Sequence, residues 1–292
     1  LVQKLTLPKE YRKHIYFLPF NFHENWARML WSYYRGPEEG YRPLDYEVIT
    51  PGSDSFVHLF VFGFNRMGRA LTLEAIRLCH YANYASGKVR TKITIVDMNM
   101  AALWDFFCTQ YPYLHQVEDV EIETIEARVD RSVVRDRLVE AARTRACLLT
   151  VAICLKDPDL SLATGLNLPD EVYAAGSSVL VRQELQCGLA NVVNAVNEGK
   201  YCNVKAFGML NYGIDLRMAK DTLATYVHGM WKVGKEKGFD YAQKWVETLH
   251  LKSDAEIREF RNQAILWWGE LSEEQRWSNR YSIDTFDMYL RS

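Results

Sequence analysis

From residue 56 onward, short β-rich apolar runs alternate with amphipathic helical stretches, and this alternation constrains the fold more than any other feature of the chain. Parallel strands need long crossover connections, usually helices, so the pattern predicts a parallel sheet with helices on both faces. The predicted strands are residues 58–62, 92–96, 120–125, 147–155, 178–182 and 203–209. The predicted helices between them include 67–82, 101–108 and 132–145, where apolar residues recur at helical spacing.

Several of these strands are apolar on both faces, and residues 147–155 form the most continuous such run. Strands of this kind are typical of a sheet that is buried on both sides. Because crossovers in parallel sheets are almost always right-handed, the sequence predicts a doubly wound, Rossmann-like α/β domain.

The composition and periodicity of the chain change twice, which predicts three regions. Residues 1–55 are rich in aromatic residues and proline without clear periodicity, and we interpret them as an irregular N-terminal extension and linker. Residues 56–212 form the Rossmann-like domain. Residues 213–292 contain no further strand pattern and predict a small all-α domain of ordinary size.

The all-α region shows four helical faces and one clear helix start. The apolar positions are Leu216, Ala219, Leu223, Val227 and Met230 for the first helix, Tyr241, Trp245 and Leu249 for the second, Ile257, Phe260, Ala264 and Trp267 for the third, and Ile283, Phe286 and Leu290 for the fourth. Ser272 and Gln275 form a capping-box pattern, so the fourth helix is expected to begin directly after Ser272.

A glycine turn lies where the first predicted strand meets the first predicted helix, in Gly63-Phe-Asn65-Arg66-Met67-Gly68. In a dinucleotide fingerprint the first glycine makes the turn, the middle one lets the backbone approach the pyrophosphate, and the third lets the helix pack on the strand. The amide groups at the helix N-terminus then hold the phosphates. Here Asn65 takes the middle place. Asparagine tolerates left-handed backbone angles, so we expect the turn to survive, and Arg66 could add charge toward a phosphate.

An acidic residue at the end of the next strand would complete such a site, because it accepts hydrogen bonds from the ribose hydroxyls. Asp97 takes that position, and an acid there disfavours a 2′-phosphate. The sequence therefore favours NAD or another adenine nucleotide over NADP.

Composition excludes some functions. The formal net charge is −2, which gives no general attraction to nucleic acid or to anionic membranes. The most apolar stretch is too short to cross a bilayer. The six cysteines, Cys79, Cys108, Cys147, Cys154, Cys187 and Cys202, form no C-x-x-C pair, and we expect free thiols in a reducing cytoplasm.

The stretch from His58 through the glycine turn to Leu71, followed by the strand that ends at Asp97, resembles the NAD-binding domain of Trk-type potassium transport regulators. These are the RCK domains, and the resemblance extends from Phe56 to about Tyr212. It implies a ligand-sensing Rossmann domain whose nucleotide positions map onto Gly63, Asn65, Arg66, Met67, Gly68 and Asp97.

The same resemblance implies further properties. It points to regulation of potassium or other cation transport, to a homodimer, and to a membrane channel or transporter subunit as partner. It also implies a cytoplasmic location at the inner face of a membrane. Because the chain begins at Leu1 rather than Met, we expect it to be the cytosolic part of a longer protein with an upstream membrane segment.

The all-α region is similar to the RyR domain, a small helical repeat named from ryanodine receptors. The residues that carry this similarity are Val227, His228, Trp231, the run from Trp268 to Arg280, and Asp284. The segment His23-Glu-Asn-Trp-Ala27 echoes the opening of the same repeat.

Catalytic candidates are weak. The Tyr-x-x-x-Lys pairs Tyr84/Lys88 and Tyr201/Lys205 have a dehydrogenase spacing but unsuitable surroundings, and the seven histidines show no metal-binding spacing. We therefore predict no catalytic residues and no metal site. Our first hypothesis is a non-enzymatic, nucleotide-sensing regulator. The alternatives are an NAD-dependent oxidoreductase of unknown substrate and a protein-interaction module on a degenerate Rossmann scaffold.

Overall fold

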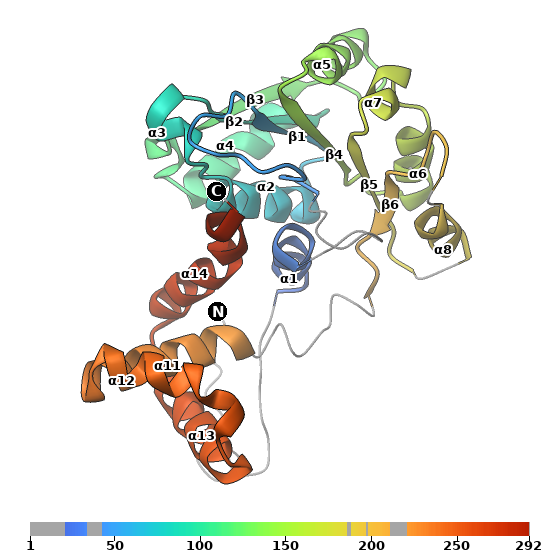
Figure 1. Ribbon diagram of the computed structural model, residues 1–292. Coiled ribbons are helices and arrows are strands. Elements are labelled where there is room, and N and C mark those ends of the chain that lie inside the picture. Colours follow the sequence, from blue (N-terminus) through green and yellow to red (C-terminus); the bar gives the residue numbers. More distant parts are fainter. Residues whose placement is uncertain (1–20, 34–42, 186–187, 197, 211–220, 292) are drawn as a thin grey trace. The chain divides into compact units, whose positions relative to one another are not determined.

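The computed structural model describes residues 21–33, 43–185, 188–196, 198–210 and 221–291, without the side chains of 188–189 and 287–291. These residues belong to two compact units (Figure 1). Among the described residues, the sheet unit comprises residues within 21–215 and 288–291, and the helical unit lies within residues 216–287. The predicted boundary at residue 213 lies outside the described residues.

The sheet unit contains a six-stranded, all-parallel sheet, so the fold class predicted from sequence is confirmed. Its strands are β1 (Phe56–Phe62), β2 (Thr91–Asp97), β3 (Val120–Glu126), β4 (Cys147–Ile153), β5 (Ser178–Arg182) and β6 (Val204–Phe207). They follow the order β3-β2-β1-β4-β5-β6, so the strand order reverses between β1 and β4. In open sheets of this kind, ligands bind at the carboxyl ends of the strands at that reversal.

Helices cover both faces of the sheet (Figure 1). They are α2 (Arg66–Leu78), α3 (Asn83–Gly87), α4 (Met100–Gln110), α5 (Ser132–Arg143), α6 (Pro158–Leu166), α7 (Asp170–Ala174) and α8 (Gly188–Ala195), with a short 3₁₀ turn at Leu114–Gln116. Alternate residues of β1 belong to two separate cores. Val57, Leu59 and Val61 pack with α2 and α4, whereas Phe60 and Phe62 pack with α5, α6 and α7. This two-sided burial explains why the strand sequences are almost continuously apolar.

The segment before β1 is more ordered than the sequence indicated. Residues Phe22–Arg28 form helix α1, and Met29–Tyr33 continue it as a π-helical turn. Trp26 and Trp31 are buried in the core on the α2 face, and their indole N–H groups donate to the carbonyl oxygens of Met209 (3.1 Å) and Leu71 (3.0 Å). Residues 21–33 are therefore part of the sheet unit.

The described helical unit consists of α11 (Thr222–Lys237), α12 (Phe239–Glu247), a 3₁₀ turn at Leu249–Leu251, α13 (Asp254–Glu270) and, up to residue 287, α14 (Glu273–Arg291). The predicted capping box is confirmed. The Ser272 hydroxyl accepts from the Gln275 N–H (3.3 Å), and the Gln275 side chain accepts from the Ser272 N–H (3.0 Å). A second capping box, Ser253 with Glu256, starts α13, although the sequence analysis overlooked this S-x-x-E pattern.

The apolar face predicted for the first of these helices is wrong in part. Leu223 and Val227 are exposed on α11, and the helix instead buries Ala224, Thr225, His228 and Gly229. A Cβ on Gly229 would lie 2.7 Å from Cβ of Ala264, so these small residues let α11 and α13 approach closely. Leu216, Ala219 and the side chain of Leu290 lie outside the described residues.

No helix among the described residues is long and apolar enough to cross a membrane.

Candidate functional site

Gly63 and Gly68 are required by the geometry of the turn between β1 and α2. Gly63 has a left-handed φ of +88°, and a Cβ there would lie 2.8 Å from the carbonyl oxygen of Cys154. A Cβ on Gly68 would overlap the carbonyl oxygen of Gly63 and would lie 3.3 Å from Cγ1 of Val61. The first glycine therefore makes the turn and the third lets α2 pack on β1, as the fingerprint requires.

Asn65 behaves differently from the expectation. Its backbone is extended (φ −74°, ψ −168°), so the left-handed angle that we expected asparagine to tolerate falls on Gly63 instead. Its side chain is the N-cap of α2, and Oδ1 accepts from the N–H groups of Met67 (3.0 Å) and Gly68 (3.3 Å). Nδ2 donates to the carbonyl oxygen of Cys154. The carboxamide thus fills two of the amide donors that a phosphate would use at a helix N-terminus.

Asp97 lies directly beside the turn, because β1 and β2 are neighbours and both end at this edge of the sheet. Its Oδ2 accepts from the Phe64 N–H (2.8 Å) and its Oδ1 accepts from the Asn99 N–H (3.0 Å). Each carboxylate oxygen has a second acceptor position, so a ribose hydroxyl can still donate to this group. The acid therefore positions the turn and keeps capacity for a ligand.

The six residues predicted to bind the nucleotide differ in burial and in which of their atoms face the turn. Met67 is buried in the core, so only its backbone N–H faces the turn. Arg66 is exposed, and its backbone N–H has no hydrogen-bond partner among the described residues. Cys154 lies across from the turn, and burial raises the pKa of its thiol to about 12. That thiol stays protonated and is no nucleophile at neutral pH.

Beside this turn, α1, α2 and α4 enclose a cavity of about 450 Å³, which we call the α1–α2–α4 cavity. Arg66 and Arg69 of α2 line it, together with His23 of α1. Arg69 was not among the site residues predicted from sequence, and His23 was singled out only for its likeness to the RyR opening. The spacing of Arg66 and Arg69, three apart on one helix, is a signal that could have found the pair.

The residues with a dehydrogenase spacing have structural roles. Lys88 ends α3 in a left-handed conformation, and its Nζ lies 4.5 Å from the centre of the Tyr84 ring. Lys205 is buried and donates to the carbonyl oxygen of Val196 (2.6 Å), and burial lowers its pKa.

His58, in β1, contacts the Thr94 hydroxyl (2.9 Å). Burial, followed by the charges of Lys92 and Arg137, lowers the pKa of His58 to about 3.

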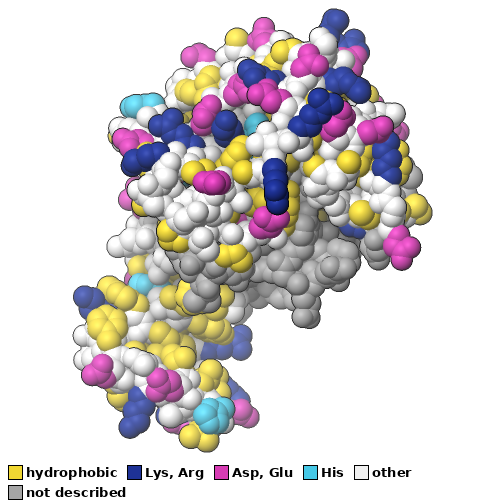
Figure 2. All heavy atoms as spheres, turned by 45° about the horizontal axis from the view of Figure 1, so that its top comes forward, with side chains coloured by type: hydrophobic (Ala, Val, Ile, Leu, Met, Phe, Trp, Pro, Cys, Tyr) yellow, Lys and Arg dark blue, Asp and Glu magenta, His cyan; other side chains and the backbone are white. Residues whose placement is uncertain are grey.

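Other sequence interpretations concern charge and cysteine. Basic and acidic side chains intermix over the face of the sheet unit that Figure 2 displays. Around α5 they form ion pairs, among them Arg137–Glu123 (3.1 Å) and Arg143–Glu171 (2.8 Å). Five of the six cysteines are free thiols, and Cys187 lies outside the described residues. No cluster of three or more potential metal ligands occurs within the described part of the chain.

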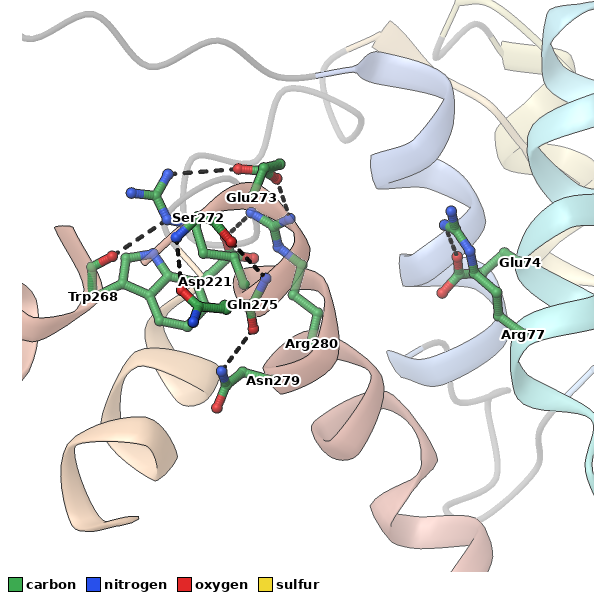
Figure 3. Close-up of polar contacts among 10 residues, drawn as sticks. Glu74, Arg77, Asp221, Trp268, Ser272, Glu273, Gln275, Asn279 and Arg280 are labelled. Carbon is green, nitrogen blue, oxygen red and sulfur yellow. Dashed lines mark hydrogen bonds and ion pairs between the residues drawn. The ribbon is translucent and has the colours of Figure 1, made fainter. Parts of the chain in front are cut away.

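Residues that carried the RyR similarity come together in the helical unit. The His228 ring stacks on Trp231 (5.7 Å between centroids) and meets the edge of Trp268 (6.4 Å). Figure 3 shows Arg280 reaching Asp221 and Glu273, at 2.6 and 2.5 Å. Arg280 and Asp221 are both nearly buried, so this pair joins the start of α11 to α14. The arrangement is a packed core with a polar anchor.

No family model matches the chain, and comparison with curated proteins and with solved structures likewise finds no match.

Proposed function

We propose that the sheet unit is a regulatory domain that binds NAD(H) or another adenine nucleotide at the turn between β1 and α2. The observation that carries this proposal is the hydrogen bond from the Phe64 N–H to the Asp97 carboxylate (2.8 Å). It holds the glycine turn and the ribose-binding acid together at the edge where the strand order reverses.

The ligand's groups have specific partners in this arrangement. A phosphate would approach the N-terminus of α2, where the Arg66 N–H is unoccupied among the described residues. The ribose hydroxyls of the adenosine half would donate to Asp97. A 2′-phosphate would meet the negative charge of that carboxylate, which favours NAD over NADP.

Asn65 suggests how binding would change the protein. For a phosphate to use the N–H groups of Met67 and Gly68, the Asn65 carboxamide must leave them and release the carbonyl of Cys154. The free and bound states then differ in local conformation, and a ligand that prefers one of them shifts the population. The RCK resemblance extends this proposal to cation transport, with a homodimer and a membrane channel or transporter subunit as partners.

Calorimetric titration with NAD, NADH, ATP, ADP and AMP tests the proposal. We expect wild-type protein to bind at least one of them, Asn65→Gly to bind it more tightly, and Asp97→Ala to bind it about ten- to a hundredfold more weakly. Asp130→Ala removes an equivalent charge at an exposed site and should leave affinity unchanged. Absence of binding at millimolar ligand, in both wild type and Asn65→Gly, would refute the proposal.

One observation favours a second candidate, a protein-interaction module on a Rossmann scaffold. The Asn65 side chain already satisfies both the Met67 and Gly68 N–H groups, so the turn is stable without a ligand. This candidate predicts that Asn65→Gly acquires no nucleotide affinity and that Asp97→Ala changes stability only.

A further inference from the structure

The α1–α2–α4 cavity carries more positive charge than its neighbours neutralise. Arg66 and Arg69 form no ion pair among the described residues. His23 faces the same space from α1. Among the described residues that line the cavity, Glu24 alone is acidic. Two guanidinium groups that have no carboxylate partner within the described part of the chain, and that line one cavity, favour an anionic occupant.

The walls hold these groups in place. The Arg69 guanidinium lies 5.6 Å from the centre of the Phe106 ring, so a cation–π contact orients it. His23 lies in the first turn of α1, whose N-cap is the Asn21 side chain. The ring of Tyr111 packs on Phe107 of α4, with centroids 4.9 Å apart. The volume of about 450 Å³ falls within the usual range for a small-molecule site.

We propose that the α1–α2–α4 cavity is a second anion site of the sheet unit, which binds a phosphate or pyrophosphate group through Arg69, Arg66 and His23. The group is either a free ion or part of a nucleotide. This site uses the outward side of α2, whereas the proposed nucleotide site uses the backbone of the glycine turn. The inference therefore does not depend on the proposed function.

The charges around His23 make this binding depend on pH. Burial lowers the pKa of His23, and Arg182 of β5 and Arg66 and Arg69 of α2 lower it further. Glu24 on its own helix and Tyr111, directly after α4, are the other titratable groups of the lining. Arg182 already pairs with Glu184 (2.7 Å), but a bound anion would offset the charges of Arg66 and Arg69 and raise this pKa, so binding takes up a proton. Anion affinity should therefore rise as pH falls.

Calorimetry with inorganic pyrophosphate tests the site directly. We expect binding to wild type, and binding about ten- to a hundredfold weaker to Arg69→Gln, because a charge-assisted contact is lost. Arg145→Gln is the matched control, since this exposed arginine follows the C-terminal end of α5 and is absent from the cavity lining. Thermal melting should show that both variants remain folded.

Two further arms identify the source of the anion and separate the two sites. If ADP binds more tightly than pyrophosphate and Arg69→Gln weakens both, the ligand of the cavity is a nucleotide. If the two bind equally, the ligand is the free ion. Asp97→Ala should weaken nucleotide binding at the turn and leave pyrophosphate binding intact. Sulfate is the probe for the pH dependence, because its own charge does not change in this range. The affinity of the wild type for sulfate should be higher at about pH 6 than at about pH 8, and His23→Gln should remove that difference. Pyrophosphate binding that Arg69→Gln leaves unchanged, or no binding to wild type, overturns the proposal.

Discussion

The two units of this protein bury different kinds of residue. In the sheet unit the largest fully buried side chains are aromatic, including Phe60, Phe62 and Phe207. In the described part of the helical unit the buried apolar residues are alanines (Ala224, Ala242 and Ala264), accompanied by polar groups such as His228 and Asp284. Large apolar side chains lie on the outside of the helical unit instead, as Figure 2 shows.

This difference indicates how each unit is stabilised. The free energy of burial scales with apolar area, so the core of large aliphatic and aromatic side chains stabilises the sheet unit most. The described part of the helical unit depends more on close approach of small residues, on capping boxes and on the Arg280–Asp221 pair. Single substitutions should therefore act through different mechanisms in the two units.

The largest effect is expected from truncation of the aromatic core. Phe60→Ala should destabilise the sheet unit by about 3–5 kcal/mol, because Phe60 is fully buried against Phe62 and the α5 face. Leu266→Ala, at a position with 63% exposure in the helical unit, should cost less than about 0.5 kcal/mol. Urea unfolding followed by circular dichroism measures both, and equal losses would refute the contrast.

The polar anchor of the helical unit should come next. Arg280→Met breaks the nearly buried pair with Asp221, and we expect a loss of about 3 kcal/mol, the lower end of the range for a broken buried pair. Arg276→Met removes a more exposed arginine from the same helix and serves as the control. Thermal unfolding followed by tryptophan fluorescence should separate the two variants. A loss no larger than that of the control would show that the pair is not an anchor.

A pH effect should follow from His58 in the sheet unit. Its folded pKa of about 3 lies below the unfolded value of 6.5, so only the unfolded chain takes up this proton between those values. The contribution of His58 to the free energy of unfolding should be constant above pH 6.5. Below pH 6.5 it should fall as pH decreases, by about 2–3 kcal/mol near pH 4.5. Urea unfolding near pH 7 and near pH 4.5 should show a smaller drop for His58→Gln than for wild type. An unchanged drop would assign the acid sensitivity to other groups.

The turn glycine should give a smaller loss. Gly63→Ala places a side chain at φ +88°, which costs about 1–2 kcal/mol, and adds a close contact with the Cys154 carbonyl. Gly52→Ala is the control, because a Cβ there meets nothing within 4 Å and Gly52 has no positive φ. Differential scanning calorimetry should show a lower melting temperature for Gly63→Ala only.

The smallest losses of stability are expected at the helix caps. These substitutions allow the most direct comparison of the two units, because the same type of contact is removed from each. Asn65→Ala in the sheet unit and Ser253→Ala in the helical unit should each cost about 1 kcal/mol, because both side chains accept from backbone N–H groups at a helix start. Hydrogen exchange of the first turns of α2 and α13 would detect the local opening. If only Asn65→Ala had an effect, the capping box would contribute little to the helical unit.

Much of the sheet unit was predictable from local pattern. Strand 178–182 agrees with β5 at both ends, and helix 132–145 overlaps α5, because apolar periodicity and burial coincide there. The short helix α6 was missed, although Asp157 and Pro158 are a recognisable N-cap and first-turn pair. For α11 the predicted face was offset by one position, since Gly229 and His228, rather than Leu223 and Val227, contact the rest of the unit.

At the candidate site, the local sequence predicted which residues lie together at the turn, but not which hydrogen bonds they form. Gly63, Gly68 and Asp97 follow from a strand–turn–helix–strand pattern. The Asn65 side chain that caps α2 also donates to the Cys154 carbonyl, which directly follows β4, a strand far along the chain. The convergence of His23 with Arg66 and Arg69 likewise requires α1 to pack on α2.

The sequence by itself determined the α/β class, the parallel sheet and the place of the glycine turn, because these depend on periodicity and on residues close together in the chain. Only the tertiary structure decided that the Asn65 side chain accepts from the first amides of α2, that residues 21–33 belong to the sheet unit, and that Arg66, Arg69 and His23 line one cavity. Such features arise from contacts between residues distant in sequence, and no local pattern encodes them.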